Sequence, residues 1–158
     1  MLEFTCEGDL RTARNFTRGF GGDTYNTAVA ASHLGSSVGF MTRIGNDLMA
    51  QALQENMIKE NIELACPRPA KGPTGMYMVA VNGEGQRDFA YYRKDSAASQ
   101  FGPEDVNPEL IKNAKVVYSS GITMGISERC RQAVIKAFTI AQEAGVMTAF
   151  DPNYREIL

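Results

Sequence analysis

Short apolar segments alternate with helical segments along most of this chain, and that alternation restricts the possible folds more than any other feature. It predicts strands over residues 37–42, 62–66, 115–120 and 146–150, and helices over residues 24–34, 47–60, 108–113 and 127–145. Helices that alternate with buried strands are typical of a doubly wound parallel sheet, in which ligands bind at the carboxyl ends of the strands. We therefore expect an α/β fold, and the 158 residues suffice for one domain of this kind, spanning residues 1–158.

Two parts of the chain do not follow this alternation. Residues 74–81 and 87–93 are strand-like around a turn at residues 82–86, which is the clearest hairpin signal in the sequence. Short extended pieces also occur near the N-terminus. We expect segments about 2–18 and 73–94 to form a small β lid that covers one end of the α/β body.

A double glycine precedes the first predicted helix, in the segment Gly21-Gly22-Asp23-Thr24-Tyr25-Asn26. Glycine lets a ligand approach the backbone closely, and the free N–H groups at the start of a helix attract oxygen atoms. Asp23 and Asn26 add short polar side chains that can bind hydroxyl groups, so the segment is a candidate site for a polyhydroxylated ligand. The simpler alternative is that Asp23 only caps the helix, as aspartate often does.

A second polar cluster, Tyr91-Tyr92-Arg93-Lys94, ends the hairpin. Strand alternation places Tyr91 and Arg93 on one face of the hairpin, and Tyr77 lies on the partner strand. One face would then carry two phenols and a guanidinium. The alternative is an ordinary amphipathic strand with packed aromatic rings and a solvated arginine.

A third cluster, Asp151-Pro152-Asn153-Tyr154-Arg155, directly follows an apolar strand. The carboxyl end of a strand is a ligand position in an α/β fold, although Asp-Pro and Asn are equally good turn formers. Arginine binds planar anions through two parallel hydrogen bonds. If Arg93 and Arg155 converge, we expect the ligand to be a small carboxylate that also carries hydroxyl groups.

Composition excludes several classes of function. The net charge of −2 offers no electrostatic surface for nucleic acid, and no apolar run approaches the roughly 20 residues of a membrane span. The single histidine, His33, rules out a multi-histidine metal site and a Ser/His/Asp set, and we predict no metal ligands. Three widely spaced cysteines, Cys6, Cys66 and Cys130, form no CxxC motif and are expected to be reduced thiols of a cytoplasmic protein.

Six segments occur in an order that is typical of one family. They are Gly21-Gly22-Asp23-Thr24-Tyr25-Asn26-Thr27-Ala28, Arg43-Ile44-Gly45-Asn46-Asp47, Thr74-Gly75-Met76-Tyr77, Tyr91-Tyr92-Arg93-Lys94-Asp95-Ser96-Ala97-Ala98, Ser120-Gly121-Ile122 and Asp151-Pro152-Asn153-Tyr154-Arg155. Over nearly its whole length the chain resembles the ribokinase-like (pfkB-type) carbohydrate kinases, and among them it is similar to the 2-keto-3-deoxygluconate kinases. The double glycine is common to many sugar kinases, whereas the Tyr-Tyr-Arg-Lys and Asn-Tyr-Arg segments are more specific to the sugar-acid branch.

The resemblance implies a partial ribokinase-like fold and a reaction. In that reaction the γ-phosphoryl group of ATP passes, with the help of Mg²⁺, to a hydroxyl group of 2-keto-3-deoxygluconate. The resemblance implies that the substrate is bound by Gly22, Asp23, Asn26, Tyr77, Tyr91, Arg93 and Arg155, and that Asn153 and Arg155 lie near the nucleotide. It also implies that the lid can join two copies of the chain in a homo-oligomer.

The resemblance covers only the N-terminal half of the family. Family members are longer, and their later half carries a Gly-Ala-Gly-Asp motif whose aspartate takes the proton from the substrate hydroxyl. That motif is absent from this sequence, so we expect no catalytic residue in the chain and no phosphoryl transfer by the chain alone. Two alternatives stay open: a non-catalytic sugar-binding or dimerising module, and a kinase for a neutral ketose such as fructose.

Overall fold

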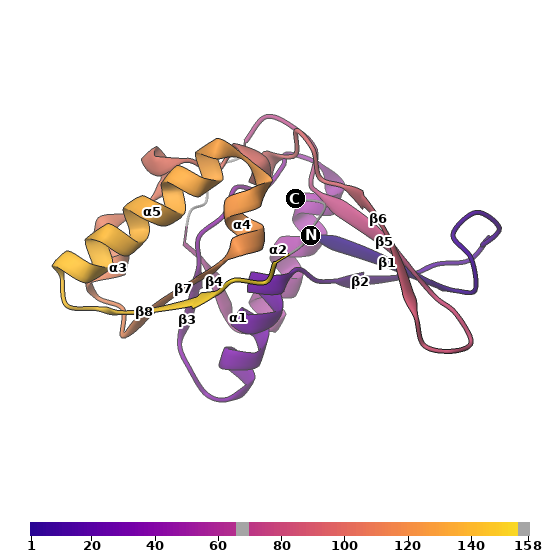
Figure 1. Cartoon of the computed structure of the whole chain (residues 1–158), viewed down its shortest axis with the longest axis horizontal. Coiled ribbons are helices and arrows are strands. Elements are labelled where there is room, and N and C mark those ends of the chain that lie inside the picture. Colours follow the sequence, from indigo (N-terminus) through magenta and orange to yellow (C-terminus); the bar gives the residue numbers. More distant parts are fainter. Residues whose placement is uncertain (66–69, 155–158) are drawn as a thin grey trace.

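The computed structural model of the chain describes residues 1–65 and 70–154 and contains both helices and strands (Figure 1). The strands are β1 (Leu2–Glu7), β2 (Thr17–Phe20), β3 (Val38–Phe40), β4 (Ile62–Leu64), β5 (Met76–Val81), β6 (Arg87–Tyr92), β7 (Val116–Ser120) and β8 (Met147–Asp151). The helices are α1 (Asp23–His33), α2 (Leu48–Lys59), α3 (Pro108–Lys112), α4 (Gly121–Ile126) and α5 (Glu128–Glu143), with two 3₁₀ turns, η1 (Ala97–Gln100) and η2 (Pro103–Asp105).

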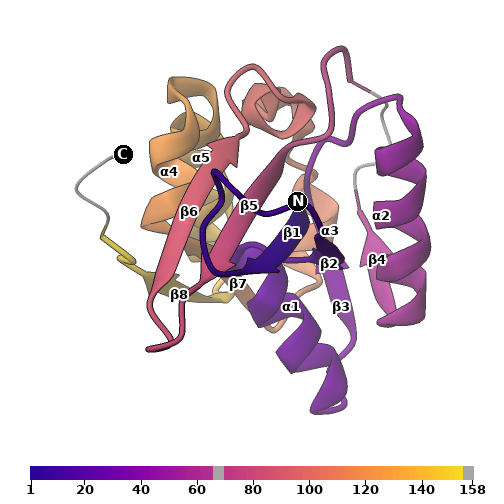
Figure 2. The same ribbon diagram turned by 90° about the vertical axis from the view of Figure 1, so that its right-hand side faces the viewer.

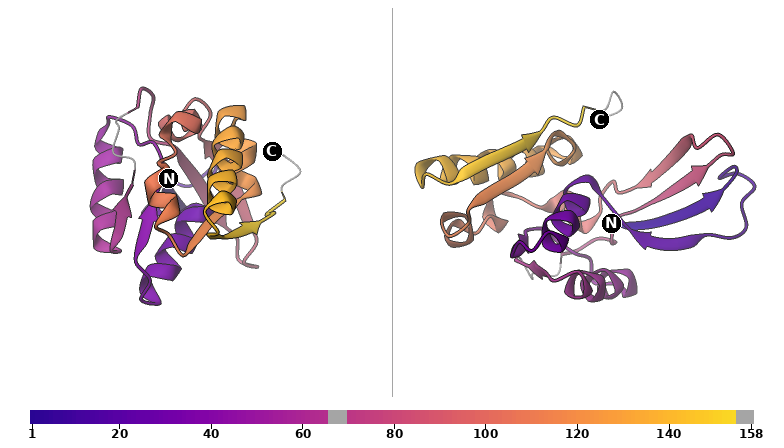
Figure 3. Two further views of the ribbon diagram at one scale, coloured as in Figure 1. Left: turned by 90° about the vertical axis from the view of Figure 1, so that its left-hand side faces the viewer. Right: turned by 90° about the horizontal axis from the view of Figure 1, so that it is seen from below.

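The strands within residues 1–65 and 70–154 form three sheets. One has four strands in the order β2-β1-β5-β6, and the other two are the parallel pairs β3–β4 and β7–β8. In the four-stranded sheet β1 runs parallel to β5, whereas the pairs β1–β2 and β5–β6 are antiparallel. This sheet projects from the helical part of the molecule, as Figures 1 and 3 show. The helices and parallel pairs confirm the predicted α/β fold class.

Among the residues that the structure describes, two hydrophobic clusters hold the helical part together. The first joins α1 and α2 to the β3–β4 pair, and its buried members are Tyr25, Ala28, Ile44, Ala50, Leu53, Met57 and Ile62. The second joins α5 to α3 and β7, and its buried members are Val106, Ile111, Val117, Ala133, Ala137 and Ala141. Helix α1 contacts both parallel pairs, so it connects the two halves of the body (Figure 2).

The structure differs from the sequence-based expectation at two helix starts. Helix α4 was not predicted, because its six residues include two glycines and lack an amphipathic pattern. Helix α2 begins at Leu48 and is capped by Asp47, whereas the predicted helix already included residue 47. No helix in the described part of the chain is long and apolar enough to cross a membrane.

Asp47 joins the start of α2 to the segment that leads into β5. Its carboxylate accepts hydrogen bonds from the backbone N–H of Ala50 at 2.7 Å, from the backbone N–H of Thr74 at 2.8 Å and from the Thr74 hydroxyl at 2.8 Å. Burial acts to raise the pKa of this carboxyl group, but the hydrogen bonds from Thr74 and from the start of α2 together lower it. The ionised form is therefore favoured by the folded state.

We expect Asp47→Ala to lower the free energy of unfolding by about 2 kcal/mol at neutral pH, because the cap and the bonds to Thr74 are both lost. A carboxyl group with a lowered pKa stabilises the fold above its unfolded pKa of about 3.9, and this contribution disappears as the pH falls through the folded value. The difference between wild type and variant in urea titrations should thus shrink below about pH 4. Asn46→Ala, at the exposed neighbouring position, is the control, and an equal difference at pH 7 and in acid would contradict this account.

Candidate functional site

One face of the four-stranded sheet carries an aromatic wall, formed by Glu3, Tyr77, Phe89, Tyr91 and Arg93. Glu3 on β1 is the register partner of Tyr77 on β5, and Tyr77 is the partner of Tyr91 on β6. The rings of Tyr77 and Tyr91 have centroids 5.8 Å apart, and the Arg93 guanidinium carbon lies 4.7 Å from the centre of the Tyr91 ring. The structure therefore brings Tyr77, Tyr91 and Arg93 to one face, as strand alternation predicted.

Glu3 is a member of this wall that the sequence analysis missed. Its carboxylate accepts hydrogen bonds from the hydroxyl of Tyr77 and, at 3.0 Å, from the hydroxyl of Thr5. Burial and the neighbouring Glu3 carboxylate both raise the pKa of the Tyr77 phenol, so this hydroxyl stays protonated and donates. Alternation within β1 places Glu3 and Thr5 on the same face. The contact between Glu3 and Tyr77, however, joins residues 74 positions apart, and local sequence patterns do not reveal such a contact.

The double glycine lies directly against the aromatic wall. A Cβ atom added at Gly21 would overlap the Tyr77 hydroxyl and would lie 3.1 Å from a carboxylate oxygen of Glu3. Gly22 is the N-cap of α1 with φ 137° and ψ 145°, a backbone region that is nearly restricted to glycine. These two positions require glycine for different reasons: close approach at Gly21 and backbone conformation at Gly22.

Asp23 does not cap helix α1, so the simpler interpretation of this motif is wrong. The cap is Gly22, without a side-chain hydrogen bond, and Asp23 is the first helical residue. The Asp23 carboxylate instead accepts a hydrogen bond from the hydroxyl of Ser120, at the end of β7. The carboxyl end of a parallel strand thus meets the start of α1, which is the ligand position expected in an α/β fold.

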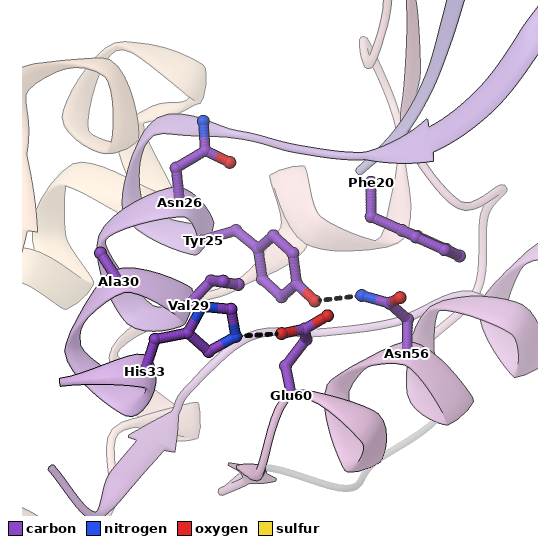
Figure 4. A pocket seen from close by; sticks show the side chains of 8 residues that line it. All are labelled: Phe20, Tyr25, Asn26, Val29, Ala30, His33, Asn56 and Glu60. Atoms are coloured by element: carbon purple, nitrogen blue, oxygen red, sulfur yellow. Dashed lines mark hydrogen bonds and ion pairs between the residues drawn. The ribbon is translucent and has the colours of Figure 1, made fainter. Parts of the chain in front are cut away.

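Asn26 is exposed and lies one helical turn after Gly22, to whose carbonyl oxygen its backbone N–H donates at 2.7 Å. It lines a groove of about 480 Å³ between α1 and α2, together with Phe20, Tyr25, Val29, Ala30, His33, Asn56 and Glu60 (Figure 4). Several polar groups of this groove satisfy one another: His33 Nε2 lies 2.6 Å from Glu60 Oε2, and Asn56 donates to the Tyr25 hydroxyl at 2.6 Å. We regard the aromatic wall together with the start of α1, and not this groove, as the candidate site.

The third polar cluster forms a turn at the end of β8. The backbone N–H of Asn153 donates to the Asp151 side chain at 2.9 Å, which is the turn geometry that Asp and Asn favour. Asp151 is the register partner of Ser120, so this turn adjoins the end of β7. Arg155 lies outside the described residues, and its convergence with Arg93 stays a prediction.

The described residues form neither a metal site nor a phosphate-binding loop of their own. Residues 1–65 and 70–154 contain no group of three or more His, Cys, Asp or Glu side chains placed to hold a metal ion. The sequence also lacks the Gly-x-x-x-x-Gly-Lys-Ser/Thr loop that cradles nucleotide phosphates. Cys6 and Cys130 are buried free thiols, and Cys66 lies outside the described residues.

Comparison with known proteins gives one family. The model described as "pfkB family carbohydrate kinase" matches residues 1–158. Probable fructokinase-2 of Arabidopsis thaliana is 35% identical over 150 residues, which are 94% of this chain and 45% of that protein. Fructokinase-1 of Zea mays is 33% identical over 153 residues, which are 94% of this chain and 46% of that protein. The chain spans about half the length of the curated relatives it matches.

Solved structures agree on the fold. A PfkB protein from Polaromonas sp. JS666 superposes with a TM-score of 0.92 at 28% identity, over 99% of this chain and 54% of that one. A sugar kinase from Pyrococcus horikoshii in complex with ATP gives 0.85 at 28% identity, over 98% and 51%. A protein proposed to be a 2-keto-3-deoxygluconate kinase from Enterococcus faecalis gives 0.88 at 20% identity, over 99% and 47%. At 20% identity this last likeness shows the fold alone.

Proposed function

Because the chain belongs to the pfkB family of carbohydrate kinases, we propose that it forms the sugar-binding part of an ATP-dependent kinase that phosphorylates a ketose. The observation that carries this proposal is the contact between the double glycine and the aromatic wall. Gly21 packs on Tyr77, and Asp23 begins α1 immediately beyond it. Bare backbone at Gly21 thus adjoins the phenol of Tyr77 and the carboxylate of Glu3, and the Asp23 carboxylate follows two residues later; this combination suits a ligand rich in hydroxyl groups.

A neutral ketose such as fructose is the substrate we favour. The fructokinase names of relatives at 33–35% identity support it. The composition of the wall supports it as well, because the Glu3 carboxylate accepts hydrogen bonds from hydroxyls and would repel a second carboxylate nearby. The E. faecalis protein, which shares only the fold, supports 2-keto-3-deoxygluconate less strongly.

The sugar acid stays the second candidate because of Arg93. This guanidinium belongs to the aromatic wall, where it stacks on Tyr91, and a guanidinium is the group that holds a planar carboxylate best. The wall therefore carries charges of both signs: the Glu3 carboxylate favours hydroxyl groups, and the Arg93 guanidinium favours an anion. The affinities of the chain for fructose and for 2-keto-3-deoxygluconate distinguish the two candidate substrates.

We assign roles to the rest of the site on the same basis. Gly22, Asp23, Asn26, Tyr77, Tyr91, Arg93 and Arg155 would bind the sugar, and Asn153 and Arg155 would lie near the nucleotide. The four-stranded sheet would act as a lid, and its second face would contact another subunit. ATP would supply the phosphoryl group and Mg²⁺ would accompany it. The chain contains no residue that we assign as the base, so by itself it should bind sugar without phosphorylating it.

Arg93→Ala tests which sugar the site prefers. By isothermal titration calorimetry we expect the wild-type chain to bind D-fructose more tightly than 2-keto-3-deoxygluconate. In the variant, affinity for the acid should fall at least about tenfold, while affinity for fructose should change less than about threefold, because only the acid offers a carboxylate to the guanidinium. Lys94→Ala, which removes the neighbouring exposed positive charge, is the matched control.

Each departure from this pattern has a distinct meaning. Equal losses for both sugars would refute the role of Arg93 in recognising an acid. Tighter wild-type binding of the acid would overturn the neutral-ketose assignment and favour the second candidate. A wild-type chain that binds neither sugar would overturn the proposed function.

A further inference from the structure

Ser120 is a fully buried hydroxyl at the junction of three elements. It ends β7, it precedes α4 as the N-cap, and its hydroxyl donates to a carboxylate oxygen of Asp23 at the start of α1. The two residues are 97 positions apart in the sequence. No local sequence signal connects them, and no role in sugar binding has yet been given to Ser120.

The hydrogen-bonding capacity of a serine hydroxyl determines which group donates and which group accepts at this junction. A hydroxyl has one proton to donate, and an ionised carboxylate only accepts, so the proton of Ser120 is committed to Asp23. The Ser120 oxygen in turn accepts from the backbone N–H of Thr123 at 3.3 Å and lies 3.4 Å from the Thr123 hydroxyl. The hydrogen bond from Thr123 therefore orients the Ser120 hydroxyl, and this hydroxyl in turn orients one carboxylate oxygen of Asp23.

The second oxygen of Asp23 is left for another donor. Only Oδ2 takes part in the bond to Ser120, and within residues 1–65 and 70–154 no group donates to Oδ1. Asp23 is half-buried, and no fully buried side-chain oxygen or nitrogen in the described residues lacks a partner. Oδ1 is accordingly in reach of solvent and of a ligand.

We propose that Ser120 is a positioning residue for sugar binding. Its hydroxyl holds Oδ2 of Asp23, and Oδ1 is thereby oriented to accept a hydrogen bond from a hydroxyl group of the sugar. The inference rests on the proposed function and adds to it a role for Ser120 and a hydrogen bond from the sugar to Asp23. A purely structural role, in which Ser120 only caps α4 and ties α1 to β7, would affect stability but not sugar affinity.

A double-mutant cycle distinguishes these two roles. D-fructose affinity of the chain is measured by calorimetry, and thermal unfolding reports folding of each variant. We expect Ser120→Ala to weaken binding about tenfold, and Asp23→Asn/Ser120→Ala to bind no more weakly than Asp23→Asn alone, because the serine acts through the aspartate. Ser120→Thr keeps the hydroxyl and should restore affinity to within about threefold of wild type.

The control is Ser119→Ala, one residue earlier on the same strand. Ser119 is also buried, but its side chain makes no hydrogen bond within the described residues, so fructose affinity should change less than about twofold. If Ser120→Ala does not fold, Ser120→Cys makes the same comparison, because it keeps the size of the side chain and replaces the hydroxyl with a weak donor.

The outcomes separate this inference from the function it rests on. Sugar binding by wild type with unchanged affinity in Ser120→Ala would overturn the positioning role alone. Losses that add in the double variant would also overturn it, because the two residues would then act independently. A wild-type chain that binds neither fructose nor 2-keto-3-deoxygluconate would overturn both proposals.

Discussion

Gly22→Ala should weaken sugar binding by the chain at least about a hundredfold, and should also lower the free energy of unfolding by about 1–3 kcal/mol. Gly22 has φ 137° and ψ 145°, which an alanine adopts only under strain. A Cβ atom at this position would meet nothing closer than 3.8 Å, so the backbone conformation, not a steric clash, is the cause. Relief of the strain would displace the first N–H groups of α1 and the Asp23 carboxylate from the positions in which they are proposed to meet the sugar.

The other end of the same helix supplies the control. Gly35 follows α1 with φ 88°, and a Cβ atom there would meet nothing within 4 Å. Gly35→Ala should therefore cost a comparable part of the stability while leaving calorimetric sugar affinity unchanged. Equal loss of affinity in the two variants would mean that binding follows the general stability of α1 and not the geometry of its first residue.

The largest stability effect is expected at Asp105, far from the aromatic wall. Asp105 ends the 3₁₀ turn η2, and its side chain is only 1% exposed. It accepts two hydrogen bonds from Arg43, at 2.7 Å and 3.0 Å, and one from the backbone N–H of Gly102 at 2.8 Å. Asp105→Ala should lower the free energy of unfolding by about 3–4 kcal/mol, because the largely buried Arg43 guanidinium would lose both of its bonds to Asp105 and would keep the more exposed carboxylate of Glu104, which it bonds at 2.9 Å. Urea titration measures this change.

Asp9 offers a matched ion pair at the surface. Its hydrogen bonds with Arg11 lower the pKa of the Asp9 carboxyl to about 2, yet the Asp9 side chain is 43% exposed and that of Arg11 87%. Solvent screens such a pair, so Asp9→Ala should leave the urea midpoint almost unchanged. If the two variants were destabilised equally, burial would not be the reason for the importance of Asp105.

Local sequence patterns predicted most elements but not how the strands pair over long distances. The hairpin β5–β6 follows from its turn and its alternation, and the observed pairing of Tyr77 with Tyr91 needs no further information. The parallel pairing of β1 with β5 joins segments far apart in the chain, and only the folded structure reveals it. Helix α4 escaped prediction because a serine cap and packing stabilise it, while its two glycines favour other conformations.

The candidate site shows the same division. The glycines, the two phenols and Arg93 could be selected from the sequence because each belongs to a recognisable local motif. Glu3 and Ser120 could not, since their importance comes from contacts with Tyr77 and Asp23 across 74 and 97 positions. The roles of Arg93 and Arg155 in recognising an acid also depend on a long-range contact, and the sequence alone could only propose it.

The contact between Gly21 and Tyr77 also bears on how related sequences can vary. The phenol oxygen occupies the space that any side chain at position 21 would need, so the sizes of these two residues are linked. A relative with alanine or serine at the first position can keep the same backbone only with a shorter residue at the second. Substitutions at the two sites should therefore arise together across the family, and a tyrosine at the second position should coincide with glycine at the first.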